Sequence, residues 1–169
     1  MTVFNIRTVK LASGGQFRDV KRVELEPIEL GGQRYVPIPE DPEAALTITR
    51  LSSGLMFELE LDVRLAGPCV RCLADAGIDV SVRSREYQAT SGESDDELKT
   101  PYLVGDHLDL SAWARDAVSL SLPEKILCRP DCAGLCPVCG RDLNVEPHEH
   151  EEAEVDSRWA ALAELKERL

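Results

Sequence analysis

Four cysteines crowded into residues 128–139 constrain the fold of this chain more than any other feature of its sequence. Cys128, Cys132, Cys136 and Cys139 are close enough in sequence to surround one tetrahedral ion unaided, and zinc is the ion that suits a sulfur cage. The Cys-Pro-Val-Cys-Gly half favours a tight turn whose backbone N–H groups point at the sulfurs, with Gly140 free to adopt a positive φ. The sequence therefore predicts a knuckle in which these four cysteines hold one structural zinc.

Disulfides and redox chemistry are the competing explanations for the six cysteines of the chain. Residues 1–10 contain no apolar signal core, so nothing favours an oxidising compartment, and metal binding is the better explanation in a reducing cytosol. A redox role for Cys136 and Cys139 requires a thiol at a helix start, whereas the sequence Gly-Arg-Asp-Leu-Asn that follows predicts a turn. A thiol-based redox protein or sensor that uses Cys-x2-Cys pairs remains the alternative hypothesis.

A second Cys-x2-Cys pair, Cys69 and Cys72, needs two further ligands to complete a metal site. Either it shares an ion with Cys136 and Cys139, which leaves the other two cysteines spare, or it is an independent thiol pair. The local four-cysteine site ranks first because it needs no long-range closure. His148 and His150 could also ligate a metal, but with four thiols at hand they are interpreted as exposed residues.

The charge of the chain limits the partners that it can bind. A formal net charge of −12 disfavours a large nucleic-acid footprint and favours a basic protein partner. The sequence contains no apolar run of membrane-spanning length and no lipidation signal, so we expect a soluble, cytoplasmic protein without membrane contact. Oligomeric state stays open at this stage.

Alternating apolar and charged residues predict antiparallel strands in the first half of the chain. The clearest run, residues 55–65, presents one face to a core and the other to water. Shorter runs of the same kind are residues 20–28, 46–51 and 78–87. Gly31 and Gly32 predict a turn, and the proline-rich stretch 37–42 predicts an extended connector that lacks ladder donors.

Helical spacing of apolar residues appears in two places. Asp109 is a good N-cap for a helix over 110–121, which Pro123 ends. Asp156 would cap a final helix that carries an apolar stripe. The expected fold is α+β, an antiparallel β meander or partly closed barrel with a packed helix, a zinc knuckle and a C-terminal helix. Its expected parts are a sheet domain over 1–122, the knuckle over 123–145, and an acidic linker with the last helix over 146–169.

In combination, these motifs resemble the YceD family of large ribosomal RNA subunit accumulation proteins. The resemblance rests on the Cys69-Val-Arg-Cys72-Leu motif, the run from Asp109 to Pro123, the block from Cys128 to Asn144, and the ending Asp-x-Arg-Trp-Ala-Ala-Leu at 156–162. It implies a role in accumulation or processing of the precursor of large-subunit ribosomal RNA, and a link to a large-subunit ribosomal protein. It implies no established enzymatic activity.

The leading hypothesis is therefore a non-enzymatic ribosome-biogenesis factor with a structural zinc, since no catalytic constellation of carboxylates or histidines appears in the sequence. Its partners would be a large-subunit ribosomal protein, the precursor RNA, or both. Arg71, Arg83 and Arg85 form the one basic cluster that the sequence offers as an RNA phosphate contact, although a solvated strand face explains the same residues.

Overall fold

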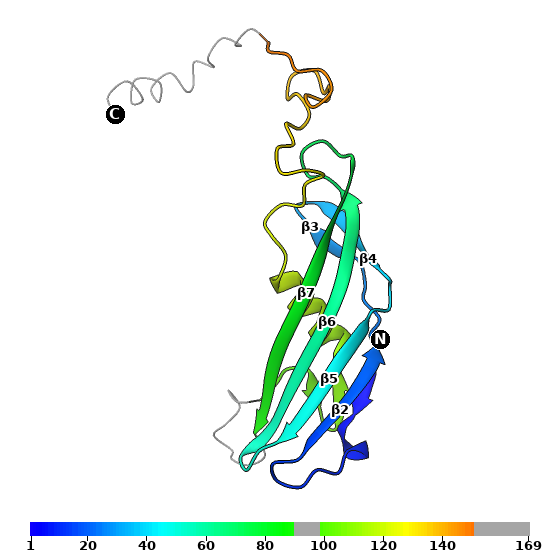
Figure 1. Cartoon of the computed structure of the whole chain (residues 1–169), viewed down its shortest axis with the longest axis vertical. Helices are drawn as coiled ribbons and strands as arrows, with labels where there is room; N and C mark the ends of the chain where they lie inside the picture. Colours follow the sequence, from blue (N-terminus) through cyan, green and yellow to red (C-terminus); the bar gives the residue numbers. More distant parts are fainter. Residues whose placement is uncertain (90–98, 151–169) are drawn as a thin grey trace, which may run out of the picture. The chain divides into compact units, whose positions relative to one another are not determined.

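The computed structural model describes residues 1–89 and 99–150 (Figure 1). Within these ranges no helix is long and apolar enough to cross a membrane. The contacts divide the chain into two compact units, Met1–Cys132 and Ala133–Leu169. This boundary falls inside the cysteine-rich segment that the sequence sets apart as one part. The helix predicted after Asp156, and most of the acidic loop before residue 101, lie outside the described residues.

The main sheet is organised around one long hairpin. Strands β6 (Gly54–Pro68) and β7 (Asp75–Ala89) are each 15 residues long, and they pair antiparallel from Gly54 opposite Ala89 to Pro68 opposite Asp75. In β6 the side chains alternate between buried and exposed, as the period-two pattern of residues 55–65 predicts. The two strongest strand predictions are thus confirmed, and both strands extend beyond the predicted bounds.

Two strands share the other edge of β6. Strand β5 (Glu43–Arg50) pairs with its first half and β4 (Gln33–Ile38) with its last part, while β2 (Gln16–Arg22) and β3 (Ile28–Leu30) add outside β5 and β4. No pairing among the described strands joins β7 back to β2 or β3, so the sheet is open and the expectation of a partly closed barrel is not supported. The fold is α+β with antiparallel sheets.

Strand β4 occupies part of the stretch that was expected to be a connector. Pro37 lies inside β4 opposite Leu65, and the connector begins at Pro39 after a cis Ile38–Pro39 bond. The prediction of a connector was wrong here. Because β4 pairs with β6 only from Val36 to Ile38, the missing N–H group of Pro37 costs the pairing few hydrogen bonds.

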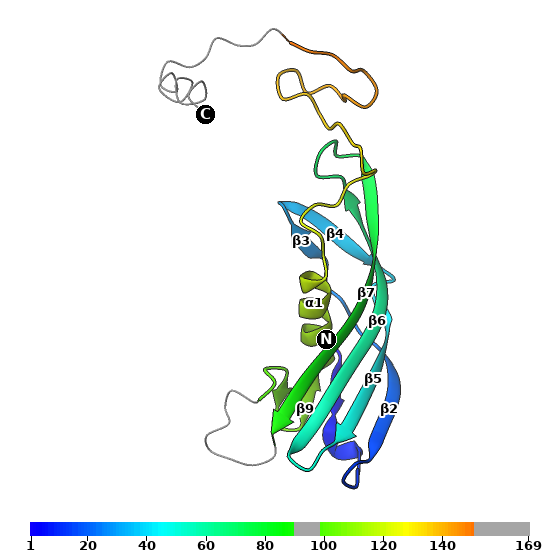
Figure 2. The same cartoon turned by 60° about the vertical axis from the view of Figure 1, so that its left-hand side comes forward.

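Within residues 1–89 and 99–150, one helix covers a face of the main sheet. Strands β1 (Val3–Asn5), β8 (Leu103–Val104) and β9 (His107–Asp109) form a small antiparallel sheet, and a 3₁₀ turn, η1 (Ile6–Thr8), follows β1. Helix α1 (Leu110–Leu120) begins directly after β9, where the Asp109 carboxylate accepts the Ala112 N–H at 3.0 Å. Figure 2 shows α1 on one side of the main sheet. The predicted helix and its N-cap are confirmed.

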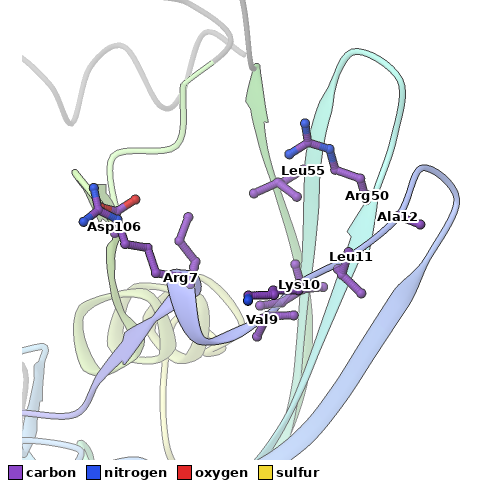
Figure 3. Close-up of a pocket in the computed structure, with 10 residues that line it drawn as sticks. Arg7, Val9, Lys10, Leu11, Ala12, Arg50, Leu55 and Asp106 are labelled. Carbon is purple, nitrogen blue, oxygen red and sulfur yellow. The ribbon is translucent and has the colours of Figure 1, made fainter.

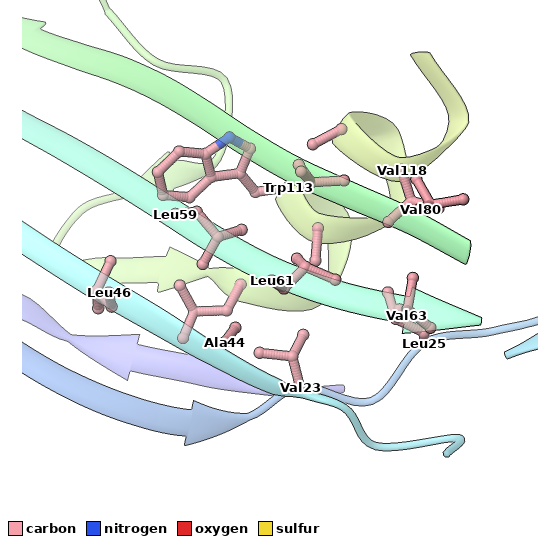
Figure 4. Close-up of a cluster of buried hydrophobic side chains, with 14 of the residues drawn as sticks. Val23, Leu25, Ala44, Leu46, Leu59, Leu61, Val63, Val80, Trp113 and Val118 are labelled. Carbon is pink, nitrogen blue, oxygen red and sulfur yellow. The ribbon is translucent and has the colours of Figure 1, made fainter. Parts of the chain in front are cut away.

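The hydrophobic core lies between α1 and the inner face of β5, β6 and β7 (Figure 4). Trp113 of α1 is 1% exposed and donates its indole N–H to the Ser84 hydroxyl of β7 at 2.9 Å. Its indole also stacks on Tyr102, with ring centroids 6.1 Å apart. These contacts hold α1 against β7 of the main sheet.

Candidate metal centre

Four cysteine sulfurs come together in the first unit. The Sγ atoms of Cys69, Cys72, Cys128 and Cys132 lie within 4.8 Å of one another. The Cys69–Cys132 and Cys72–Cys128 sulfurs are 3.8 and 3.6 Å apart. Tetrahedral zinc with Zn–S bonds of about 2.3 Å spaces its sulfurs by about 3.8 Å, whereas a disulfide bond is about 2.05 Å long. The sulfur spacing therefore fits a tetrahedral metal ion.

The hairpin loop between β6 and β7 presents the first two sulfurs. The Cys69 N–H donates to the Ala74 carbonyl at 2.7 Å, and the Leu73 N–H donates to the Cys69 carbonyl at 3.0 Å. Leu73 has a φ of 61°, a left-handed conformation that closes this turn. The buried Tyr35 hydroxyl donates to the Pro68 carbonyl at 2.8 Å, which anchors the strand end directly before Cys69.

The segment after α1 brings the other two sulfurs to the loop. The Val70 N–H donates to the carbonyl of Ile126, a residue only 2% exposed, at 3.1 Å. The Arg71 guanidinium donates to the Cys132 carbonyl at 2.6 Å. These two hydrogen bonds join the hairpin loop to the segment that carries Cys128 and Cys132.

This grouping differs from the one that proximity in sequence suggested. Cys128 and Cys132 lie with Cys69 and Cys72, inside the first unit, while Cys136 and Cys139 belong to the second unit. Proximity in sequence favoured a site made of four neighbouring cysteines. The return of the chain from α1 to the hairpin loop is a tertiary feature, and sequence spacing alone does not reveal it.

Burial and backbone donors give the four thiols different acidities. Burial opposes ionisation of Cys69, but the backbone N–H groups of Cys72, Cys128 and Arg71 outweigh it and lower the pKa of Cys69 to about 6. The Arg71 N–H is 3.4 Å from the Cys69 sulfur. The hydrogen bond with Cys72, followed by burial, raises the pKa of Cys128 to about 12. One thiolate forms readily, and a divalent cation would supply the positive charge that further thiolates need.

A second group of potential metal ligands lies within residues 133–150. The ligand atoms of Cys136, Cys139, His148 and His150 are within 4.8 Å of one another, and the Cys139 sulfur is 3.1 Å from His148 Nε2. The interpretation of the two histidines as plain exposed residues overlooked this proximity. The signal that could have found it is a His-x-His pair a short loop after a Cys-x2-Cys pair.

The three arginines proposed as an RNA contact are not gathered in one place. Arg83 and Arg85 lie on the exposed face of β7 and form ion pairs with Glu60 at 2.7 Å and Glu58 at 2.6 Å. Arg71 lies in the hairpin loop and bonds the Cys132 carbonyl. Two of the three charges are thus already matched by carboxylates of β6.

A hollow of about 580 Å³ lies at the opposite end of β6 from the hairpin loop (Figure 3). Its apolar lining includes Val9, Ile48 and Leu55. Lys10 and Arg50 also line it, and neither forms an ion pair with any residue in the described ranges. The hollow therefore combines apolar surface with two positive charges that no carboxylate of residues 1–89 or 99–150 pairs with.

Comparison with known proteins decides the family. A family model described as large ribosomal RNA subunit accumulation protein YceD matches residues 57–166, which contain most of β6, all of β7 and α1, and both groups of candidate metal ligands. The chain belongs to the YceD family. No solved structure matches this YceD-family chain.

Relatives of this YceD-family protein occur in mycobacteria and in a plant. An uncharacterized protein of Mycobacterium tuberculosis is 37% identical over 125 residues, which cover 71% of this chain and 59% of the relative. An uncharacterized protein of Mycobacterium leprae is 32% identical over 149 residues, 85% of this chain and 64% of the relative. A Zea mays chloroplast protein named large ribosomal RNA subunit accumulation protein YCED homolog 1 is 27% identical over 108 residues, 64% of this chain and 29% of the relative. The chain thus spans less than two thirds of each of these relatives.

Proposed function

We propose that this YceD-family protein is a non-enzymatic factor that supports accumulation of large-subunit ribosomal RNA. The family match over residues 57–166 carries this proposal, and the name of the maize relative agrees with it. The cysteine geometry supports a role without catalysis, because four protein ligands around a zinc leave no open position for a substrate or a water. Such a role places the protein in the compartment where ribosomes assemble, which for a bacterial relative is the cytoplasm.

The metal part of the proposal is one structural zinc held by Cys69, Cys72, Cys128 and Cys132. Its effect is mechanical, since the ion would fasten the β6–β7 hairpin loop to the chain that leaves α1. The spacing of the sulfurs and the hydrogen bond from Arg71 to the Cys132 carbonyl support this assignment. This ligand set replaces the single local cage as the preferred site.

Contact with ribosomal RNA, in this proposal, is small and local. A net charge of −12 opposes a broad RNA footprint, and the ion pairs of Arg83 and Arg85 leave little charge for phosphate on β7. Lys10 and Arg50, unpaired within the described residues, are better placed to bind phosphate oxygens. A basic large-subunit ribosomal protein fits the acidic remainder of the surface.

Crosslinking in growing cells tests the association. An affinity-tagged full chain, crosslinked by ultraviolet light and purified under denaturing conditions, should recover large-subunit ribosomal RNA or its precursor in excess over small-subunit RNA. A Lys10→Gln/Arg50→Gln variant should lose most of the crosslinks while it still sediments with large-subunit particles through its protein contact. Equal recovery of both RNAs, with no sedimentation at the large subunit, contradicts the proposed function.

A further inference from the structure

We propose that residues 133–150 form a second metal site, in which Cys136, Cys139, His148 and His150 bind one zinc ion. The four ligand atoms lie within 4.8 Å of one another and belong to a unit separate from the four-cysteine group. The protein then carries two structural ions of different ligand chemistry, one with four sulfurs and one with two sulfurs and two nitrogens. This inference goes beyond the proposed function and does not depend on it.

A fixed turn presents the two sulfurs of this site. The Cys136 N–H donates to the Arg141 carbonyl and the Gly140 N–H donates to the Cys136 carbonyl, each at 2.8 Å. Gly140 has a φ of 73°, a conformation that a side chain would strain. Leu135 and Asp142 form an antiparallel bridge beneath the turn. This hydrogen-bonded turn carries both cysteines, and their sulfurs lie within 4.8 Å of each other, as a zinc knuckle requires.

A hydrogen bond selects the ring nitrogen that faces the sulfurs. His148 Nδ1 is 2.7 Å from the Glu146 carbonyl oxygen. A carbonyl only accepts hydrogen bonds, so Nδ1 carries a proton, and in the neutral ring Nε2 is then the nitrogen with a free lone pair. That Nε2 atom is the one 3.1 Å from the Cys139 sulfur. Metal-bound histidines characteristically donate their second ring N–H to a carbonyl or carboxylate in this way.

The chain between the two ligand pairs is folded back by its own backbone. The Leu143 N–H donates to the Gly134 carbonyl at 2.9 Å, and the Glu146 N–H donates to the Asp142 carbonyl at 3.0 Å. The Glu146 carboxylate also pairs with Arg141 at 2.9 Å. Glu146, whose carbonyl orients His148, is thus tied twice to the turn that carries the sulfurs.

The size of this segment gives the ion a structural purpose. A segment as short as 133–150 buries too little apolar surface to order itself, and folds of fewer than about 40 residues usually depend on metals or disulfides. Its cysteines are free, and Val138 and Val145, two of its larger apolar side chains, are exposed. Metal ligation is the cross-link that the chemistry of these side chains supplies.

Native mass spectrometry of the full-length, reduced protein tests the inference by counting ions. The wild type should carry two zinc ions, and His148→Ala/His150→Ala should carry one. Cys136→Ser/Cys139→Ser should also carry one, because each change removes two of four ligands from the same site. His107→Ala is the matched control, since this exposed histidine of β9 is outside both groups and its variant should keep two ions.

Cobalt(II) substitution identifies which site each variant has lost. The His148→Ala/His150→Ala protein should retain the intense sulfur-to-cobalt absorption of a four-thiolate site, and Cys69→Ser/Cys72→Ser should retain a weaker two-thiolate spectrum. A wild type that binds a single ion, or histidine variants that still bind two, would overturn the inference. Because these ligands lie in their own unit, fluorescence of Trp113 in a Trp159→Phe background should show that the sheet unit stays folded in the histidine variants.

Discussion

If the four-cysteine group holds zinc, the free energy of unfolding of the sheet unit should rise with the free zinc concentration. The slope of that rise should be the slope expected for one bound ion. All four ligands, Cys69, Cys72, Cys128 and Cys132, belong to the unit that contains the main sheet and α1. Unfolding that unit separates the hairpin loop from the segment after α1 and so destroys the site. The proposed histidine-containing site lies in the other unit and should contribute nothing to this transition.

The magnitude follows from linkage. A ligand that binds one site of the folded state alone stabilises it by about 1.4 kcal/mol for each tenfold rise in free ligand above its Kd, which amounts to about 4.1 kcal/mol at 1,000 times the Kd. Two ions coupled to the same transition would double the slope to about 2.8 kcal/mol per tenfold. Thiols of the unfolded chain also bind zinc, so the one-ion slope is an upper value.

Urea unfolding at several buffered zinc concentrations measures this slope. The chain has two tryptophans, so Trp159→Phe leaves Trp113, with its buried indole bonded to Ser84, as the reporter of the sheet unit. The Cys69→Ser/Cys72→Ser variant in the same background should show no dependence on zinc. A slope that persists in that variant, or a flat response in the parent protein, would refute the assignment of the ligands.

Three further predictions concern other parts of the first unit. Lys10→Gln together with Arg50→Gln should weaken binding to single-stranded ribosomal RNA and reduce the slope of log affinity against log salt by about 1.4, because each phosphate that a cation neutralises adds about 0.7 to that slope. Trp113→Phe should lower the free energy of unfolding by about 1 kcal/mol through loss of the hydrogen bond to Ser84, as measured by urea denaturation. Burial, with a hydrogen bond to a neighbouring carboxylate, raises the pKa of Tyr102 to about 12. Since the unfolded chain loses this proton first, stability should fall as pH rises from about 10 towards 12.

Matched variants make each of these predictions decisive. Arg83→Gln/Arg85→Gln removes the same amount of positive charge as the Lys10 and Arg50 changes, but from residues that are paired with carboxylates. An equal fall in the salt slope in this variant would contradict a specific contact of Lys10 and Arg50 with RNA. Adding Ser84→Ala to Trp113→Phe should lower the free energy of unfolding only slightly further. If the losses from the two single changes add fully, the hydrogen bond between Trp113 and Ser84 is excluded. Tyr102→Phe should flatten the alkaline fall in stability, and an unchanged fall would assign it to other groups.

The strands and the helix were predictable because local rules decide them. Alternation over 55–65 and 78–87 marks the two strands that bury one face, and Asp109 followed by helical spacing marks α1. The short strands β3 and β4 were harder to foresee, because a proline-containing stretch becomes a strand only when β6 extends far enough to pair with it. The openness of the sheet likewise depends on how β4 and β5 share one edge of β6. No single segment of the sequence determines that arrangement.

The metal groups show the limit of reasoning from spacing. All six cysteines lie in groups that could hold a metal ion, but the separation of Cys128 and Cys132 from Cys136 and Cys139 depends on where the chain runs after α1. The role proposed for His148 depends on one carbonyl contact with Glu146, which has no signature in the sequence. Candidate ligands can thus be proposed from local sequence, whereas their grouping depends on tertiary structure.

The ratio of large-subunit to small-subunit ribosomal RNA in cells depleted of this protein tests the central claim most directly. The account predicts that the ratio falls on depletion and recovers when the wild-type chain is supplied. A Cys69→Ser/Cys72→Ser chain, expressed to the same level, should restore it poorly because the hairpin loop is no longer fastened. A ratio that stays unchanged after complete depletion would contradict a role in accumulation of large-subunit ribosomal RNA.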